Sequence, residues 1–164
     1  MNFALILSQL GIPADLTQDF SLLIVVALVS LALGLAVGRT RLVAILVNTY
    51  ISFALLVSVP KEYLADYTQR LIFFFVLLII LILTTKNIFE IIVVRSGYLW
   101  RVILLGFWEV MLVLTIVLAI VPKKMALDYV SLNTYPYLTL PIFHLAWLAL
   151  PIVFVILIQK NLSR

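Results

Sequence analysis

The sequence contains no cysteine, and it has a single histidine, His144, among its 164 residues. Without thiols the chain can form neither a disulfide nor a thiolate metal site, and it has no cysteine nucleophile. One histidine also excludes a metal site built from several histidines. Because no phosphate-binding loop, catalytic triad or metal-ligand spacing is present either, we expect no enzymatic activity, no cofactor and no bound metal.

Charged residues are scarce as well. They make up 11% of the chain, whereas hydrophobic residues make up 66%. A soluble domain carries about a quarter charged residues, so this composition and a mean hydropathy of +1.29 predict a protein of the lipid bilayer. The net charge of +4 would suit nucleic acid, but the basic residues stand between apolar runs, where they orient membrane helices. We therefore expect the bilayer as a partner and no nucleic acid.

The apolar runs predict an all-α fold, with residues 1–164 forming one membrane domain of five spanning helices. The apolar stretch Met1–Leu10 is too short to span and should form a helix in the membrane interface. The third span is short for the bilayer core, and its pattern continues as a cytoplasmic extension to about Arg95. The five spans cover about residues 20–38, 42–59, 71–85, 102–121 and 138–158.

A few residues should shape the ends and the course of these spans. Thr17 or Asp19 is expected to cap the first span. Pro151 falls inside the fifth span and should kink it, freeing a carbonyl for a neighbouring group or water. The phenylalanine run at residues 73–75 is expected to face lipid, and the polar connection at residues 123–137 should lie on the outer membrane surface.

The distribution of basic residues predicts the orientation, because cytoplasmic loops carry an excess of lysine and arginine. This count favours an N-terminus outside and a C-terminus in the cytoplasm. The predicted cytoplasmic residues are Arg39, Arg41, Lys86, Arg95, Arg101, Lys160 and Arg164, against Lys61, Arg70, Lys123 and Lys124 outside.

Glu109 is the one acidic residue inside a predicted span. A charged side chain at mid-membrane costs about 2.5–3.5 kcal/mol on insertion scales, so Glu109 needs a reason to be there. It is either a proton or cation site, or a protonated or hydrogen-bonded carboxyl that fastens helices together. From the rise per residue, Asn48 lies at the same depth and Ser30 within a few Å, whereas His144 lies farther out. We therefore predict a hydrogen bond between Glu109 and Asn48.

Two further features lie within the spans. Ser30, Gly34 and Gly38 recur every four residues and give the first span a smooth face for helix packing, within the chain or with another protein. We accordingly expect a membrane-protein partner or a homo-oligomer. His144 is expected to be hydrogen-bonded inside the bundle or near the outer interface, or else to titrate.

The order of these features resembles the colicin V production protein family of bacterial inner-membrane proteins, over about residues 20–124. Gly38-Arg39-Thr40-Arg41 looks like that family's glycine–arginine turn after its first span. Residues 42–59 are similar to its second span, and residues 86–101 before Gly106 to its third connection. The resemblance implies a bacterial inner membrane location and a role in envelope functions or bacteriocin production.

Two functions remain open at this point. The first is a non-enzymatic integral membrane subunit that acts through helix–helix association in a bacterial envelope process. The alternative is a small proton- or ion-linked transporter or channel component that uses Glu109, with the break at Pro151 near mid-membrane, where transporters place their sites.

Overall fold

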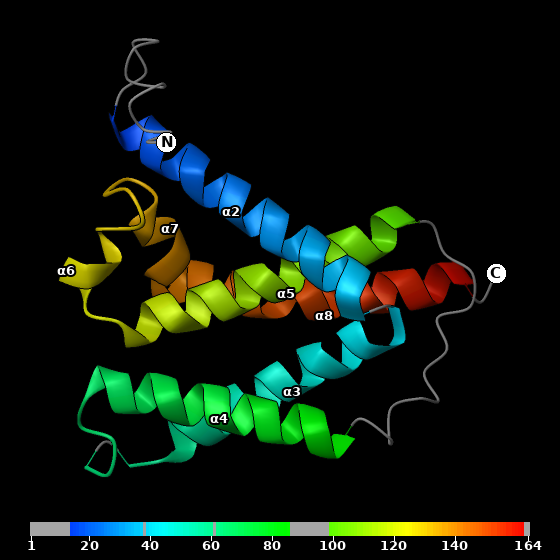
Figure 1. Ribbon diagram of the computed structural model, residues 1–164, viewed down its shortest axis with the longest axis horizontal. Coiled ribbons are helices and arrows are strands. Elements are labelled where there is room, and N and C mark those ends of the chain that lie inside the picture. Colours follow the sequence, from blue (N-terminus) through cyan, green and yellow to red (C-terminus); the bar gives the residue numbers. More distant parts are fainter. Residues whose placement is uncertain (1–13, 38, 61, 86–98, 163–164) are drawn as a thin grey trace.

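The computed structural model describes residues 14–37, 39–60, 62–85 and 99–162, and these residues form helices and connections without a strand (Figure 1). The predicted interfacial helix at Met1–Leu10, Gly38 and the extension to Arg95 lie outside the described residues. The helices are α2 (Ala14–Val37), α3 (Arg39–Ser58), α4 (Tyr67–Thr85), α5 (Leu99–Ile120), α6 (Lys123–Ala126), α7 (Tyr135–Thr139) and α8 (Pro141–Leu162).

Four of these helices, α2, α3, α4 and α5, are long and apolar enough to cross a membrane. The apolar part of α8, Pro141–Leu157, is shorter. These five helices run lengthwise, and each begins at the end of the bundle where the previous one finishes (Figure 1). The first four of these helices begin three to six residues before the predicted spans, at Ala14, Arg39, Tyr67 and Leu99, whereas α8 begins only at Pro141 and Leu138 belongs to α7.

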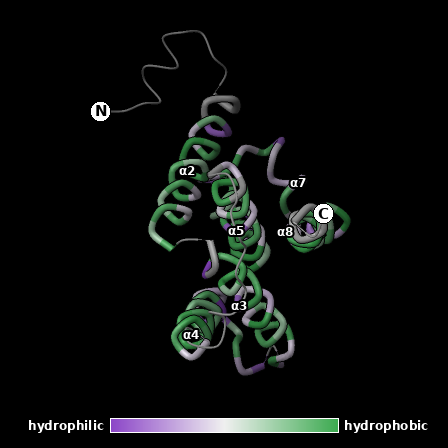
Figure 2. The backbone as a smooth tube through the Cα atoms, turned by 90° about the vertical axis from the view of Figure 1, so that its right-hand side faces the viewer, coloured by the Kyte–Doolittle hydropathy of each residue, from purple (hydrophilic) through white to green (hydrophobic). Residues whose placement is uncertain are grey.

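Polar and apolar side chains are distributed in the reverse of a soluble protein. Phe20, Leu35, Leu83, Ile142 and Leu145 are among the many large apolar side chains that are exposed on the long helices, and these helices are mostly hydrophobic along their length (Figure 2). Several polar side chains are buried inside the bundle instead. The buried polar residues on the long helices are Ser30, Asn48, Thr49, Ser52, Glu109 and Thr115.

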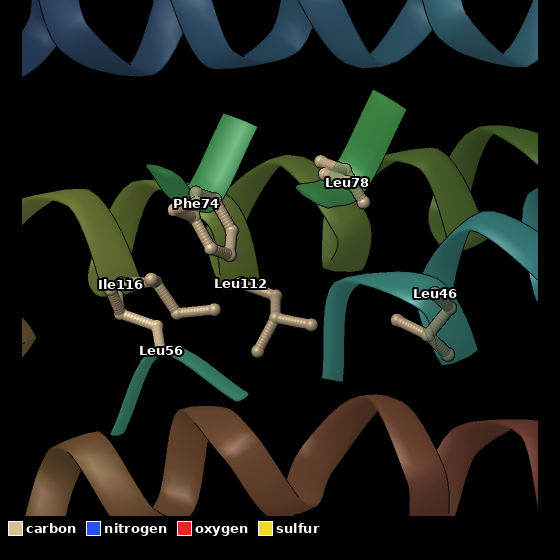
Figure 3. Close-up of a cluster of buried hydrophobic side chains, with 6 residues drawn as sticks. All are labelled: Leu46, Leu56, Phe74, Leu78, Leu112 and Ile116. Atoms are coloured by element: carbon tan, nitrogen blue, oxygen red, sulfur yellow. The ribbon is translucent and has the colours of Figure 1, made fainter. Parts of the chain in front are cut away.

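The largest buried cluster joins α3, α4 and α5. Phe74 and Leu112 are fully buried in it (Figure 3), so the phenylalanine run does not face lipid as a whole. Since lipid tails are as apolar as leucine, this contact is stabilised by close packing rather than by removal from water. The cluster comprises Leu46, Leu56, Phe74, Leu78, Leu112 and Ile116.

The most extensive contact between two helices is that of α2 with α5, and it depends on small residues. A Cβ atom placed on Gly106 would come within 2.7 Å of the Ser30 carbonyl oxygen, closer than real Cβ contacts allow. Gly34 lies against Val102, where a Cβ would make an ordinary contact at 3.5 Å. Ser30 and Gly34 therefore pack within the chain, against a glycine on α5.

A polar network at the other end of α2 fixes the connection that carries α6 and α7. Asp19 accepts hydrogen bonds from the hydroxyl groups of Ser131 at 2.8 Å and Thr134 at 2.7 Å, and from the Ser131 backbone N–H at 3.4 Å. The amide of Gln18 donates to the Leu127 carbonyl at 3.0 Å. Since α2 begins at Ala14, Asp19 is not its cap but ties the helix to this connection.

Pro151 lies within α8, which continues through it to Leu162. A proline has no N–H for the carbonyl four residues earlier, here that of Trp147. At the neighbouring position, the Tyr50 hydroxyl on α3 donates a hydrogen bond to the Leu148 carbonyl. A neighbouring helix thus supplies a donor to the turn that precedes the proline.

Candidate intramembrane polar site

The candidate site lies where α3, α4 and α5 meet in the middle of the bundle. Asn48 and Ser52 are four residues apart and therefore share one face of α3, and Thr49 lies beside them. The three side chains thus form a polar stripe on one side of the helix. Their exposed fractions are 1%, 0% and 0%, and that of Glu109 on α5 is 2%. Thr85, near the end of α4, faces the same stripe.

The hydrogen bonds within the site differ from the predicted pair. The Thr49 hydroxyl donates to Oε1 of Glu109 at 2.6 Å. The side-chain amide of Asn48 donates to the Thr85 hydroxyl at 2.7 Å, and that hydroxyl donates to the Leu81 carbonyl at 2.6 Å. The prediction of a Glu109–Asn48 hydrogen bond was therefore wrong in its partner, although it erred by a single residue along α3.

Several polar atoms in this region have no hydrogen-bond partner among the described residues. In the site these are Oε2 of Glu109, Oδ1 of Asn48 and Oγ of Ser52. A buried acceptor without a donor costs about 1–3 kcal/mol, and more for a charged group. The site is thus an incomplete network whose free atoms can accept hydrogen bonds or bind a cation.

Glu109 also lies on a groove between α2 and α4, with α5 and α3 as its floor. The groove has a volume of about 400 Å³. Val29 and Phe75 on its walls are exposed by 43% and 41%, so the groove opens sideways from the bundle, toward the lipid of a surrounding membrane. Its lining consists of Val29, Leu33, Ile45, Phe75, Leu78, Ile82, Glu109, Val110, Val113, Leu114 and Val117.

The other two predicted site residues, Ser30 and His144, make their contacts with groups other than Glu109. The Ser30 hydroxyl donates to the Val26 carbonyl of its own helix at 2.6 Å. His144 is half-buried near the start of α8 and packs edge-on against Phe53, with 5.9 Å between ring centroids. Its Nδ1 atom and Oε2 of Glu109 both lack a hydrogen-bond partner within the described part of the chain, so these two atoms are not joined.

Three residues of the site were not singled out from the sequence. Thr49 and Thr85 supply hydrogen bonds, and Gly106, one turn before Glu109, lets α2 approach α5. A signal for each was present, because polar or glycine residues within apolar runs of a membrane protein tend to face other helices. Among the described residues, no group of three or more histidine, aspartate and glutamate side chains could hold a metal ion.

The fold and the site thus define a class: a helical protein with four helices able to cross a membrane and a buried carboxyl between them. No family model matches the chain, and no characterised protein or solved structure is found that matches it. The resemblance to colicin V production proteins therefore stays a prediction.

Proposed function

We propose that the protein is an integral membrane subunit with five spanning helices, α8 being the fifth. Its N-terminus lies outside and its C-terminus in the cytoplasm of a bacterial inner membrane. The alternating directions of the five long helices and the excess of basic residues at one end support this arrangement.

A reporter fusion tests the topology. A reporter fused after Arg164 should give a cytoplasmic signal, and one inserted near the exposed Asn133 an external signal. Opposite signals at both positions would contradict the orientation, and signals from the same side would contradict five spans.

Within this arrangement we propose that the subunit acts in proton- or ion-linked transport through Glu109 and has no enzymatic activity. The observation that carries the proposal is that Oε2 of Glu109 has no partner among the described residues, while the same side chain lines a groove open to lipid. Intramembrane carboxyl groups of this kind mark ion and proton pathways. A carboxyl that only fastened helices together would be expected to have both oxygens satisfied.

A flux assay tests this proposal. The purified protein is reconstituted into vesicles that contain a pH-sensitive dye, and an ion gradient is imposed. Glu109→Gln should abolish the proton flux, whereas Glu62→Gln, at an exposed position outside the helices, should leave it unchanged. Flux that persists in Glu109→Gln, or no flux in the unchanged protein, would contradict transport through this residue.

Association with another membrane helix is the second candidate function. It is favoured by the groove between α2 and α4, since such a groove can also receive a helix of a partner in an envelope process, as the colicin V resemblance implies. The Ser30–Gly34 face gives this candidate less support, because it is used within the chain.

A further inference from the structure

A second pocket lies at the end of the bundle where α3 and α5 finish and α4 begins (Figure 1). Its volume is about 260 Å³, slightly below the range of pockets for drug-sized molecules, about 300–1,000 Å³. Seven of its eight lining residues are hydrocarbon side chains, and the eighth is Arg70. We call this site the Arg70 pocket, and it shares no residue with the groove beside Glu109.

Arg70 lies on the first turn of α4 and is partly buried. Its Nε–H donates a hydrogen bond to the Leu64 carbonyl at 2.8 Å, and Leu64 also lines the pocket. This bond holds the guanidinium group at the pocket, and because the group is planar and rigid its other donors are held with it. Within the described residues, the two Nη groups of Arg70 have neither a hydrogen-bond acceptor nor a carboxylate partner.

Two acidic residues, Glu62 and Asp66, belong to the connection between α3 and α4. Both are exposed, and neither of them lines the pocket. The Arg70 pocket thus combines a positive charge and free N–H donors with an apolar wall. A ligand that complements it needs an anionic group and an apolar chain.

The pocket lies at the level where a surrounding membrane has its headgroups. Helix α3 ends at Ser58 and α4 begins at Tyr67, and both are able to cross a membrane. Tyr63, on the connection between them, is exposed by 77%, as is typical of tyrosines at a membrane interface. Phe53, which also lines the pocket, lies five residues before the end of α3, or about 7.5 Å deeper. The pocket therefore extends from the headgroup level toward the bilayer core.

We propose that the Arg70 pocket binds one phospholipid molecule, with the phosphate on the Nη groups of Arg70 and part of one acyl chain against Phe53 and Leu56. Arginine suits this role because its planar fork of donors binds phosphate through two parallel hydrogen bonds. Val57, another lining residue, is exposed by 67%, so a lipid can enter the pocket from the side of the bundle.

Charge complementarity favours a phospholipid over the other possible occupants. A neutral diacylglycerol would fill the apolar part of the pocket but leave the Nη donors of Arg70 without an acceptor. A free phosphate would pair with Arg70 but leave the apolar walls uncovered. A phospholipid supplies both parts, and it is present in the membrane that the long apolar helices require.

Three probes test the inference: dioleoylphosphatidylglycerol, dioleoylglycerol with the same chains, and glycerol 3-phosphate without chains. Binding to the purified full-length protein is measured by native mass spectrometry after release from detergent micelles. One molecule of the phospholipid should bind at least fivefold more tightly than dioleoylglycerol, and glycerol 3-phosphate should not bind.

Two variants test the contact with the phosphate. Arg70→Gln should lower the affinity for the phospholipid at least fivefold, to that for dioleoylglycerol. It should leave the binding of dioleoylglycerol unchanged, which also shows that the pocket is intact. Lys124→Gln is the control, because it removes a positive charge from an exposed position at the same end of the bundle, and it should have no effect.

A second pair of variants tests the location of the bound lipid. Ala119→Phe adds a ring to the pocket wall at an exposed position and should weaken binding of both lipids. Ala146→Phe makes the same change at an exposed alanine of α8 outside the pocket and should have no effect. Weaker binding in both variants, or in neither, would overturn the assignment to the pocket.

The remaining outcomes also decide the question. Equal binding of the two lipids, or no binding, would overturn the inference. Equal losses in Arg70→Gln and Lys124→Gln would show a general attraction between basic residues and anionic lipid, and would overturn the role of Arg70. Tight binding of glycerol 3-phosphate that depends on Arg70 would assign the pocket to a soluble phosphate and overturn its assignment to a lipid.

Discussion

Within the described residues, two carboxyl groups lie at interfaces between elements, and they differ in how fully they are hydrogen-bonded. Asp19 accepts three hydrogen bonds, which use both of its oxygens, and so joins α2 to the connection of α6 and α7. Glu109 is more deeply buried, yet it accepts one hydrogen bond, from Thr49, and its second oxygen has no partner among the described residues.

The difference indicates how a structural carboxyl can be told from a functional one inside a membrane protein. A complete network stabilises the fold, because each buried donor and acceptor is paired. An incomplete one carries a cost of about 1–3 kcal/mol per free group. The unpaired Oε2 of Glu109 lowers the stability of the fold. Its presence beside a groove open to lipid is explained if another molecule supplies the missing hydrogen-bond donor.

The largest effect is expected at the contact of α2 with α5. Helix α2 carries Asp19 and also lines the groove beside Glu109, so both regions depend on this contact. Gly106→Leu should destabilise the protein by about 3 kcal/mol, because its side chain would collide with the backbone of α2. Gly34→Ala should cost less than about 1 kcal/mol, since its Cβ meets Val102 at an ordinary distance. Unfolding in mixed micelles, followed by circular dichroism, measures both. Equal losses would contradict the close approach at Gly106.

A smaller loss is expected on removal of Asp19. Asp19→Leu should cost about 2 kcal/mol, because the donors of Ser131 and Thr134 lose their acceptor. Asp19→Asn should cost less, since its amide oxygen can still accept. The same unfolding measurement applies. If Asp19→Leu proved harmless while Glu109→Gln was strongly destabilising, the roles of the two carboxyl groups would be reversed.

The smallest effects are expected at Glu109 itself. Glu109→Gln should change stability by less than about 0.5 kcal/mol, because an amide oxygen can still accept from Thr49. Glu109→Leu should cost about 0.6–1.7 kcal/mol, from the mean to the largest value measured for hydrogen bonds between membrane helices.

A double-mutant cycle identifies the partner of Glu109. Glu109→Leu combined with Thr49→Val should show a coupling of about 0.6–1.7 kcal/mol, whereas its combination with Asn48→Leu should be additive within about 0.5 kcal/mol. Stronger coupling to Asn48 than to Thr49 would restore the pairing predicted from the sequence.

This pairing shows how far sequence reasoning reaches in a membrane protein. The rise per residue gave the depth of Glu109 correctly to one residue, because depth follows from counting along a helix. It could not choose between Asn48 and Thr49, which differ by about 100° around α3. The rotation of α3 about its axis is decided by packing against α4 and α5. In this packing Asn48 donates a hydrogen bond to Thr85, and Thr49 donates one to Glu109.

The same limit applies to the other elements. Long apolar runs predicted the four helices able to span, because bilayer thickness imposes their length. The spacing of Ser30 and Gly34 predicted a packing face but not its partner, which is set by Gly106 on a distant part of the chain. The groove has no signal in the sequence, because it is formed by residues of four different helices.

The central claim is that the carboxyl of Glu109, unlike that of Asp19, is available to exchange a proton or an ion within the membrane. Labelling with dicyclohexylcarbodiimide, an apolar reagent that modifies carboxyl groups, tests it most directly when combined with peptide mass spectrometry. The account predicts modification of Glu109 and little modification of Asp19. An unmodified Glu109 in the folded protein, or equal modification of Glu109 and Asp19, would contradict it.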